Sequence, residues 1–61
     1  MPLVRISMWP GRTHEQKAEL AKVITETIST ITQAPPDATT ILFEDIDKAN
    51  WAKGGILYSD T

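Results

Sequence analysis

Pro2 is the residue whose position has the greatest chemical consequence, because it directly follows the initiator Met1. Aminopeptidases generally remove an initiator methionine before a small residue, and the product would begin with the secondary amine of Pro2. An ordinary α-amino group has a pKa of about 7.7–8.0, and an apolar pocket or a nearby cation lowers it by disfavouring the ammonium form. Such an amine would be partly neutral near neutral pH, as a general base requires. Position alone favours an incidental Met-Pro start, and retention of Met1 would leave an amide nitrogen without useful basicity.

Arg12 and two tryptophans are the other candidate site residues. Arg12 lies between the first predicted strand and the predicted helix. There, its guanidinium could hold a substrate carboxylate through two parallel hydrogen bonds and lower the pKa of a nearby amine. Taken alone, it is more typical of an exposed arginine at a turn. Trp9 and Trp51 lie in or beside turns, where either could form a pocket wall or pack at a subunit contact.

The composition excludes several other functions. The 61 residues contain no cysteine and one histidine, and they show no nucleophile elbow, phosphate-binding glycine loop or metal-ligand spacing. Six basic against eight acidic residues give a net charge of −2 without a basic run, which argues against nucleic acid as a partner. The apolar stretches are too short to span a membrane, and the start does not resemble a signal peptide. We therefore expect a cytoplasmic protein without a metal or a cofactor.

Two strands and a hairpin are predicted around a helix. Residues 3–9 alternate between apolar and other side chains, as in a half-buried strand, and residues 39–46 are rich in Thr, Ile and Phe. Because a long helix separates them, the two strands should be parallel with a right-handed crossover. Residues 50–58 predict a loop, a turn at Gly54-Gly55 and a short last strand over residues 56–58. This hairpin arm is expected to pack on another subunit.

The connecting helix has clear start and stop signals. Thr13 and Gln16 have the spacing of a capping box, and Pro35-Pro36 should end the helix near Gln33. Its apolar face is predicted to contain Leu20, Ile24, Thr27, Ile28 and Ile31. The predicted fold class is α+β, with a single βαβ unit of parallel strands and a short C-terminal hairpin arm.

The small size of the chain predicts an oligomer. Residues 1–61 allow one domain, whose core alone is marginal against the entropy of ordering the chain. Small domains usually compensate with disulfides, a metal or oligomerisation, and only oligomerisation suits this composition. A two-stranded sheet with one helix also leaves a sheet face uncovered. We therefore expect a homo-oligomer with a site shared between chains.

These residues together resemble the 4-oxalocrotonate tautomerase family of the tautomerase superfamily. The resemblance rests on Pro2 opening a strand, on the segments Trp9-Pro10-Gly11-Arg12-Thr13 and Glu15-Gln16-Lys17, and on an aromatic residue before Gly54-Gly55. It covers essentially the whole chain. It implies a cofactor-free isomerase with the tautomerase fold. It also implies a homohexamer, built as a trimer of dimers, whose sites are assembled from neighbouring subunits.

The resemblance also implies a role for each candidate residue. Pro2 would be the general base that takes a proton from a dienol hydroxyl and returns it to carbon. Arg12 would bind the substrate carboxylate and draw electron density. Trp51 matches a pocket aromatic that is phenylalanine in the best-known members, and Trp9 matches a pocket-lining leucine. The implied substrate is a small enol or keto acid similar to 2-hydroxymuconate, which would place the protein in aromatic catabolism.

Thr40 is a departure from the family pattern. Muconate-processing members carry a second catalytic arginine at the matching position, early in the second strand. A hydroxyl cannot replace a delocalised cation in binding a carboxylate, and the loss costs about 1.5–3 kcal/mol, or one to two decades in rate. We therefore expect Thr40 to line the site of a poor 2-hydroxymuconate tautomerase, or of an enzyme that prefers another enol, such as one with a single carboxylate.

Two alternatives remain open at this point. Superfamily relatives catalyse hydrolytic dehalogenation or decarboxylation, for which Glu44 and Asp45 on the second strand are the available carboxylates. A non-catalytic oligomeric interaction module, with an incidental Met-Pro start, is the other. Retention of Met1 together with indifference to Pro2→Ala would favour the interaction module.

Overall fold

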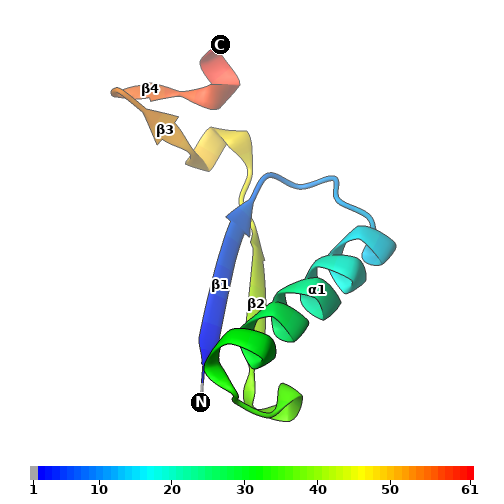
Figure 1. The fold of residues 1–61 in the computed structure, drawn as a ribbon. Coiled ribbons are helices and arrows are strands. Elements are labelled where there is room, and N and C mark those ends of the chain that lie inside the picture. The colour runs from blue at the N-terminus through cyan, green and yellow to red at the C-terminus, as the bar shows by residue number, and fades with distance from the viewer. Residues whose placement is uncertain (1) are drawn as a thin grey trace.

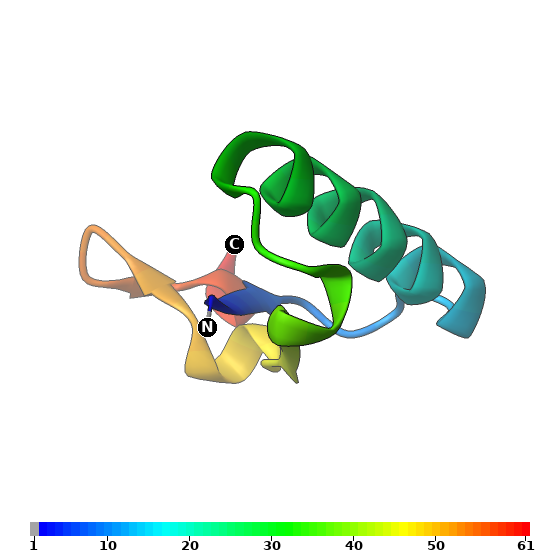
Figure 2. The same cartoon turned by 60° about the horizontal axis from the view of Figure 1, so that its bottom comes forward.

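The computed structural model describes residues 2–61 and contains one helix and four strands. Met1 lies outside the described residues. The elements in chain order are β1 (Leu3–Met8), α1 (His14–Thr32), β2 (Thr40–Asp45), β3 (Ala52–Lys53) and β4 (Ile56–Leu57). Figures 1 and 2 place α1 on one side of the β1–β2 pair, while the β3–β4 hairpin extends beyond the carboxyl ends of these strands. The predicted βαβ unit with a C-terminal hairpin is therefore confirmed.

Strands β1 and β2 pair in parallel, as predicted. Their register runs from Leu3 opposite Thr40 to Met8 opposite Asp45. Along β1, exposed side chains alternate with half-buried ones, and β2 has the same alternation as far as Phe43. One face of the pair is thus partly covered, which is the pattern of a half-buried strand. Both strands are slightly shorter than predicted, and Thr39 instead follows a short 3-10 turn over Pro36–Ala38.

Helix α1 begins and ends where its local signals predict. The Thr13 hydroxyl accepts a hydrogen bond from the Gln16 N–H at 3.1 Å, and the Gln16 side-chain oxygen accepts from the Thr13 N–H at 2.9 Å. This reciprocal pair is the predicted capping box. At the other end, Gln33 adopts a left-handed conformation with φ of 67°, and its N–H donates to the Ser29 carbonyl. The chain then leaves the helix before Pro35, as expected from the two prolines.

The face that α1 turns toward the sheet differs from the predicted apolar face. Its half-buried residues are Lys17, Ala21, Ile24, Thr25, Ile28 and Ser29. Of the predicted face, only Ile24 and Ile28 belong to this set, whereas Leu20 is 38% and Ile31 is 75% exposed, and Thr27 is exposed as well. The physical reason is that α1 has more apolar residues than a two-stranded sheet can cover. A second apolar stripe therefore remains on its surface.

The single chain has no buried core. None of residues 2–61 is buried, and the exposed large apolar side chains are Leu3, Leu20, Val23, Ile31, Leu42, Ile56 and Leu57. The radius of gyration is 14.6 Å, whereas a compact chain of this length has about 10.5 Å. The accessible area of 4661 Å² also exceeds the roughly 4,000 Å² typical of a monomer of this mass. The apolar surface must be covered by other copies for the fold to be stable.

The C-terminal hairpin is built on its two glycines. Ala52 pairs with Leu57 and Lys53 with Ile56 in antiparallel register. The turn between them needs positive φ angles, which Gly54 and Gly55 supply at 63° and 83°. Tyr58 was predicted in the last strand but lies in a 3-10 turn over Tyr58–Asp60, because the ladder ends at Leu57. Within residues 2–61, no helix has the length and apolar character needed to cross a membrane.

Candidate active site

The predicted site residues fall into two groups at opposite ends of the β1–β2 pair. We call these the amino end and the carboxyl end, after the direction of the strands. Pro2 and Thr40 lie together at the amino end, where the Thr40 N–H donates to the Pro2 carbonyl at 3.0 Å. Pro2 is half-buried and immediately precedes β1. Its position is therefore set by the parallel ladder, which is a rigid support for a catalytic group.

Trp9 and Trp51 meet at the carboxyl end in an aromatic cluster with Tyr58. The Trp9 and Trp51 ring centroids are 5.7 Å apart at 68°, an edge-to-face arrangement, and the Tyr58 ring lies 5.0 Å from Trp9. The Tyr58 N–H also donates to the Trp51 carbonyl at 2.8 Å. Three of the four aromatic residues of the chain thus gather at one end of the strands. Edge-to-face pairs stabilise such clusters beyond the area they bury.

Sequence reasoning missed two members of this region, Tyr58 and Lys48. The Lys48 ammonium lies 4.7 Å from the centroid of the Trp9 ring. Nothing local distinguishes Lys48 from the other lysines, because its partner is 39 residues earlier in the chain. Tyr58 had one available signal, since it is the only tyrosine of the chain and ends the predicted last strand.

The aromatic cluster is incomplete within one chain. The Trp9 indole N–H is buried but has no hydrogen-bond acceptor among residues 2–61. A buried donor without an acceptor costs free energy, so such groups normally find a partner. Trp9 itself remains only half-buried. The cluster therefore has the character of a surface that is completed by another molecule.

Arg12 lies in the connection that leaves β1 at the carboxyl end. It is exposed, and it forms no salt bridge in the part of the chain that the structure describes. Together with Glu15, Gln16, Glu19 and Leu20 it lines an open groove of about 460 Å³ along the first turns of α1. A guanidinium without an internal carboxylate partner is available to an external one.

One chain does not bring the predicted residues together. The six residues of β1 rise by about 3.3 Å each, so the amino and carboxyl ends are separated by about 20 Å. Pro2 and Thr40 are therefore distant from Trp9 and Trp51 of the same chain. Figure 1 shows this separation, with the N-terminus and the hairpin at opposite ends of β1.

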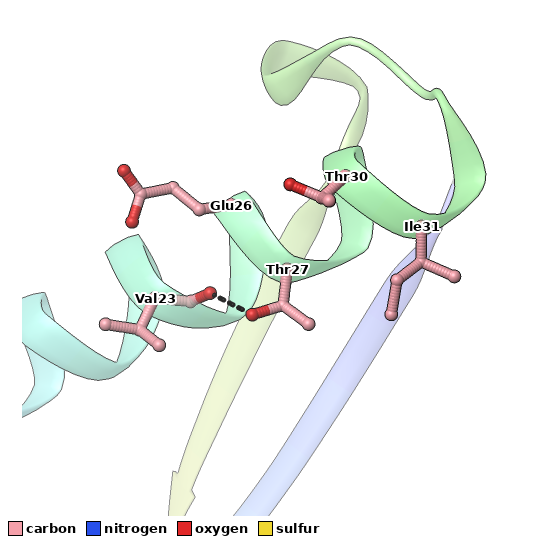
Figure 3. A pocket seen from close by; sticks show the side chains of 5 residues that line it. All are labelled: Val23, Glu26, Thr27, Thr30 and Ile31. Atoms are coloured by element: carbon pink, nitrogen blue, oxygen red, sulfur yellow. Dashed lines mark hydrogen bonds between the residues drawn. The ribbon is translucent and has the colours of Figure 1, made fainter.

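A second hollow, on α1, offers little chemistry. It measures about 280 Å³ and is lined by Val23, Glu26, Thr27, Thr30 and Ile31. Figure 3 shows that the Thr27 hydroxyl is turned toward its own helix, where it donates to the Val23 carbonyl at 2.9 Å. The hollow belongs to the uncovered apolar stripe. Over residues 2–61, no group of three or more His, Cys, Asp or Glu side chains could hold a metal ion.

Comparison with known proteins identifies the family. The family model described as tautomerase enzyme matches residues 2–60. A probable tautomerase of Bacillus cereus is 40% identical over 60 residues, covering 98% of both proteins. The crystal structure of YwhB, a homologue of 4-oxalocrotonate tautomerase, superposes with a TM-score of 0.93 at 33% identity and covers 98% of each chain. A heterohexamer 4-oxalocrotonate tautomerase from Chloroflexus aurantiacus superposes with a TM-score of 0.89 at 32% identity, over 98% of this chain and 97% of that one.

The chain therefore belongs to the tautomerase family, and the predicted resemblance to 4-oxalocrotonate tautomerase is confirmed. The match spans both ends of the strand pair and the C-terminal hairpin. Family membership supports an enzyme of the isomerase class with tautomerase-type activity.

Proposed function

We propose that this protein is a cofactor-independent keto–enol tautomerase that uses the Pro2 amine as its general base. The observation that carries the proposal is the placement of Pro2 at the amino end, where the Thr40 N–H holds its carbonyl at 3.0 Å. Removal of Met1 would free the Pro2 nitrogen at this rigid position. A backbone amine held by a strand ladder needs no rotamer change to meet its substrate.

The proposed reaction is a proton transfer between oxygen and carbon. The neutral Pro2 amine takes the proton of the substrate enol hydroxyl, and the oxygen electron pair moves through the conjugated system as the carbonyl forms. The resulting prolyl ammonium returns the same proton to a substrate carbon. Arg12 binds the substrate carboxylate and stabilises the negative charge that develops in between. The proton removed from oxygen is the one returned to carbon and no electrons leave the substrate, so the step consumes no co-reactant.

We propose further that each site is assembled from two or more copies of the chain. Pro2 of one copy would meet Trp9, Trp51 and Arg12 of another, because the ends that carry them are about 20 Å apart in one chain. Two strand pairs placed side by side in opposite directions bring an amino end next to a carboxyl end. The uncovered apolar side chains supply the contact surface. The similarity to a heterohexamer tautomerase supports a hexamer, here a homohexamer.

The side chain of Thr40 limits which substrates the site can hold well. It lies beside Pro2 and contributes a hydroxyl rather than a cation, so residue 40 itself offers no positive charge to a second carboxylate. We therefore propose an enol acid with a single carboxylate as the preferred substrate, with 2-hydroxymuconate processed poorly. The cytoplasmic location and the role in aromatic catabolism expected from the sequence stay predictions.

The test is ketonisation followed by ultraviolet absorbance, using protein whose intact mass establishes that Met1 is absent. The substrates are 2-hydroxymuconate and the monocarboxylate dienol 2-hydroxypenta-2,4-dienoate. We expect a rate on at least one substrate that falls by about a hundredfold or more in Pro2→Ala, because the rigid secondary amine of the proline ring is replaced by a primary amine that is held less firmly. A matched control adds one residue before Pro2, which leaves the ring in place but converts its nitrogen to an amide. Equal rates in all three proteins would overturn the proposal.

The hydrolytic alternative has little support from the two carboxylates of β2. Asp45 accepts from the Lys17 ammonium at 2.8 Å, and Glu44 lies 4.0 Å from the Arg5 guanidinium. A carboxylate that activates water needs an unshared lone pair directed at that water. The interaction-module alternative is distinguished by the Pro2→Ala measurement above.

A further inference from the structure

Some positively charged side chains of the protein form ion pairs within the chain, whereas Lys48 does not. Lys17 is paired with Asp45 at 2.8 Å, and Arg5 faces Glu44 at 4.0 Å. Lys48 has no carboxylate partner in the described chain and lies instead against the Trp9 ring, 4.7 Å from its centroid. It is thus a cation placed beside a candidate pocket wall without an anion of its own.

The contact with the Trp9 ring positions the Lys48 ammonium and leaves its N–H donors available. An ammonium over an indole ring is attracted by the negative face of the ring. Its three N–H donors are not consumed by acceptor atoms in this arrangement. An oxyanion that approaches the exposed side of Lys48 can therefore accept from it while the lysine stem remains on Trp9.

Lys48 is also connected to Trp51 through the backbone. Lys48 begins the 3-10 turn Lys48–Asn50, and Trp51 directly follows this turn, with its N–H donating to the Lys48 carbonyl at 3.3 Å. The same turn is closed by Asn50, whose N–H donates to the Asp47 carbonyl at 2.8 Å. Lys48 and Trp51 thus both contact the Trp9 ring and are joined by this turn. A substrate that packs against the Trp9 ring on the side of Lys48 would meet its ammonium.

We propose that Lys48 is a specificity-determining residue that binds the substrate carboxylate remote from the reacting enol. It would supply, from the carboxyl end of one copy, the second positive charge that Thr40 does not supply at the amino end of another. The inference rests on the proposed function. It adds a residue to the site: Lys48 would bind the remote carboxylate of a dicarboxylate as a point charge, without the two parallel hydrogen bonds of an arginine, so such a substrate would be bound but still processed poorly.

Lys53, in the hairpin that follows the Lys48 turn, provides a matched control. It is also an exposed lysine, five residues later in β3, but within residues 2–61 it makes no cation–π contact. The variants Lys48→Met and Lys53→Met remove the same charge and keep a long apolar side chain that can cover Trp9. A difference between them therefore reports the position of the charge rather than the net charge of the protein.

The experiment is isothermal titration of the assembled protein with two six-carbon dienoates. Muconate carries a carboxylate at each end, whereas sorbate carries only one, and neither has the enol hydroxyl needed for turnover. We expect Lys48→Met to weaken muconate binding by about tenfold and sorbate binding by less than about twofold, as for one charge-assisted hydrogen bond. Lys53→Met should change neither, and Lys48→Arg should keep most of the preference for muconate.

Three results would overturn the assignment. Equal muconate affinity in Lys48→Met and Lys53→Met would mean that Lys48 does not meet the ligand. Equal losses for muconate and sorbate would mean that Lys48 only supports Trp9. Failure of the wild-type protein to bind either ligand, while Pro2→Ala still abolishes ketonisation, would also remove Lys48 from the site but leave the proposed function intact. Absence of Pro2-dependent ketonisation, by contrast, would contradict the proposed function itself.

Discussion

The two ends of the β1–β2 pair hold their candidate residues in different ways. At the amino end, a backbone hydrogen bond from Thr40 positions Pro2. At the carboxyl end, side chains from two other segments, one with Lys48 and Trp51 and one with Tyr58, meet around Trp9. A backbone hydrogen bond is well suited to position Pro2, because the proposed reacting atom is a backbone nitrogen. Contacts between side chains are better suited to recognise a substrate. If the proposed function holds, substrate preference could change at the carboxyl end while the Pro2 amine keeps its position at the amino end.

The largest expected effect comes from mixing two inactive variants. Pro2→Ala damages only the amino end, and Arg12→Ala damages only the carboxyl end. If each site combines the two ends from different copies, an equal mixture that is unfolded and refolded together regains about a quarter of the wild-type sites. The measurement is the ketonisation rate of the refolded mixture. A mixture as inactive as its components would show that both residues serve the same chain, and refolding each variant separately is the control.

Thr40→Arg sharpens the comparison by adding a cation to the amino end. We expect the rate on 2-hydroxymuconate to rise by one to two decades, corresponding to about 1.5–3 kcal/mol for a charge-assisted contact. The same variant should also reduce the effect of Lys48→Met on muconate binding, since the two cations would serve the same ligand. Thr40→Gln, which adds length without charge, is the control. No gain on the dicarboxylate substrate would contradict the assignment of Thr40 to the site.

Trp9→Ala tests how far the carboxyl end depends on one side chain. Trp9 contacts Trp51, Tyr58 and Lys48, but it is only half-buried. We therefore expect the free energy of unfolding to fall by about 2 kcal/mol, below the range for a fully buried tryptophan. Urea denaturation at a fixed protein concentration measures the loss, and the near-ultraviolet circular dichroism of the Trp pair should weaken. Trp51→Phe, which keeps an aromatic ring, should lower the free energy of unfolding by less. An equal loss in the two variants would contradict the central position of Trp9 in the cluster.

Thr13→Ala has the smallest expected effect. It removes the hydroxyl that accepts from the Gln16 N–H at the start of α1, next to the connection that carries Arg12. Loss of an N-cap of this type costs about 1 kcal/mol of stability. Thermal unfolding should detect the change, whereas Thr13→Ser keeps the hydroxyl and should be close to neutral. A larger effect on ketonisation than on stability would mean that the capping box also positions Arg12.

Local signals predicted most of the fold. The capping box at Thr13, the helix end at Gln33 and the glycine turn at Gly54-Gly55 depend on residues within a few positions of one another, and all three are confirmed. The parallel pairing followed from the length of the connection between the strands. Such features need no knowledge of distant contacts, which explains their reliability.

Features that depend on distant packing were harder to predict. The covered face of α1 includes Lys17 and Ala21 rather than Leu20 and Ile31, because apolarity alone does not tell which stripe meets the sheet. The contact of Lys48 with Trp9 could not be predicted for a related reason, since Trp9 belongs to another segment of the chain. Residue types and the family resemblance pointed to the candidate site residues, but only the structure separated them into two ends.

The absence of any buried side chain in residues 2–61 makes protein concentration part of the stability of this fold. Because much of the apolar surface leaves water only when copies meet, folding and association should occur as one equilibrium, governed by mass action. For each association step, a tenfold dilution then removes about 1.4 kcal/mol of driving force. The melting temperature should rise with protein concentration, and a dilute sample should lose helix and activity together. The amount of protein that a cell makes would thus help to determine what fraction of it is folded.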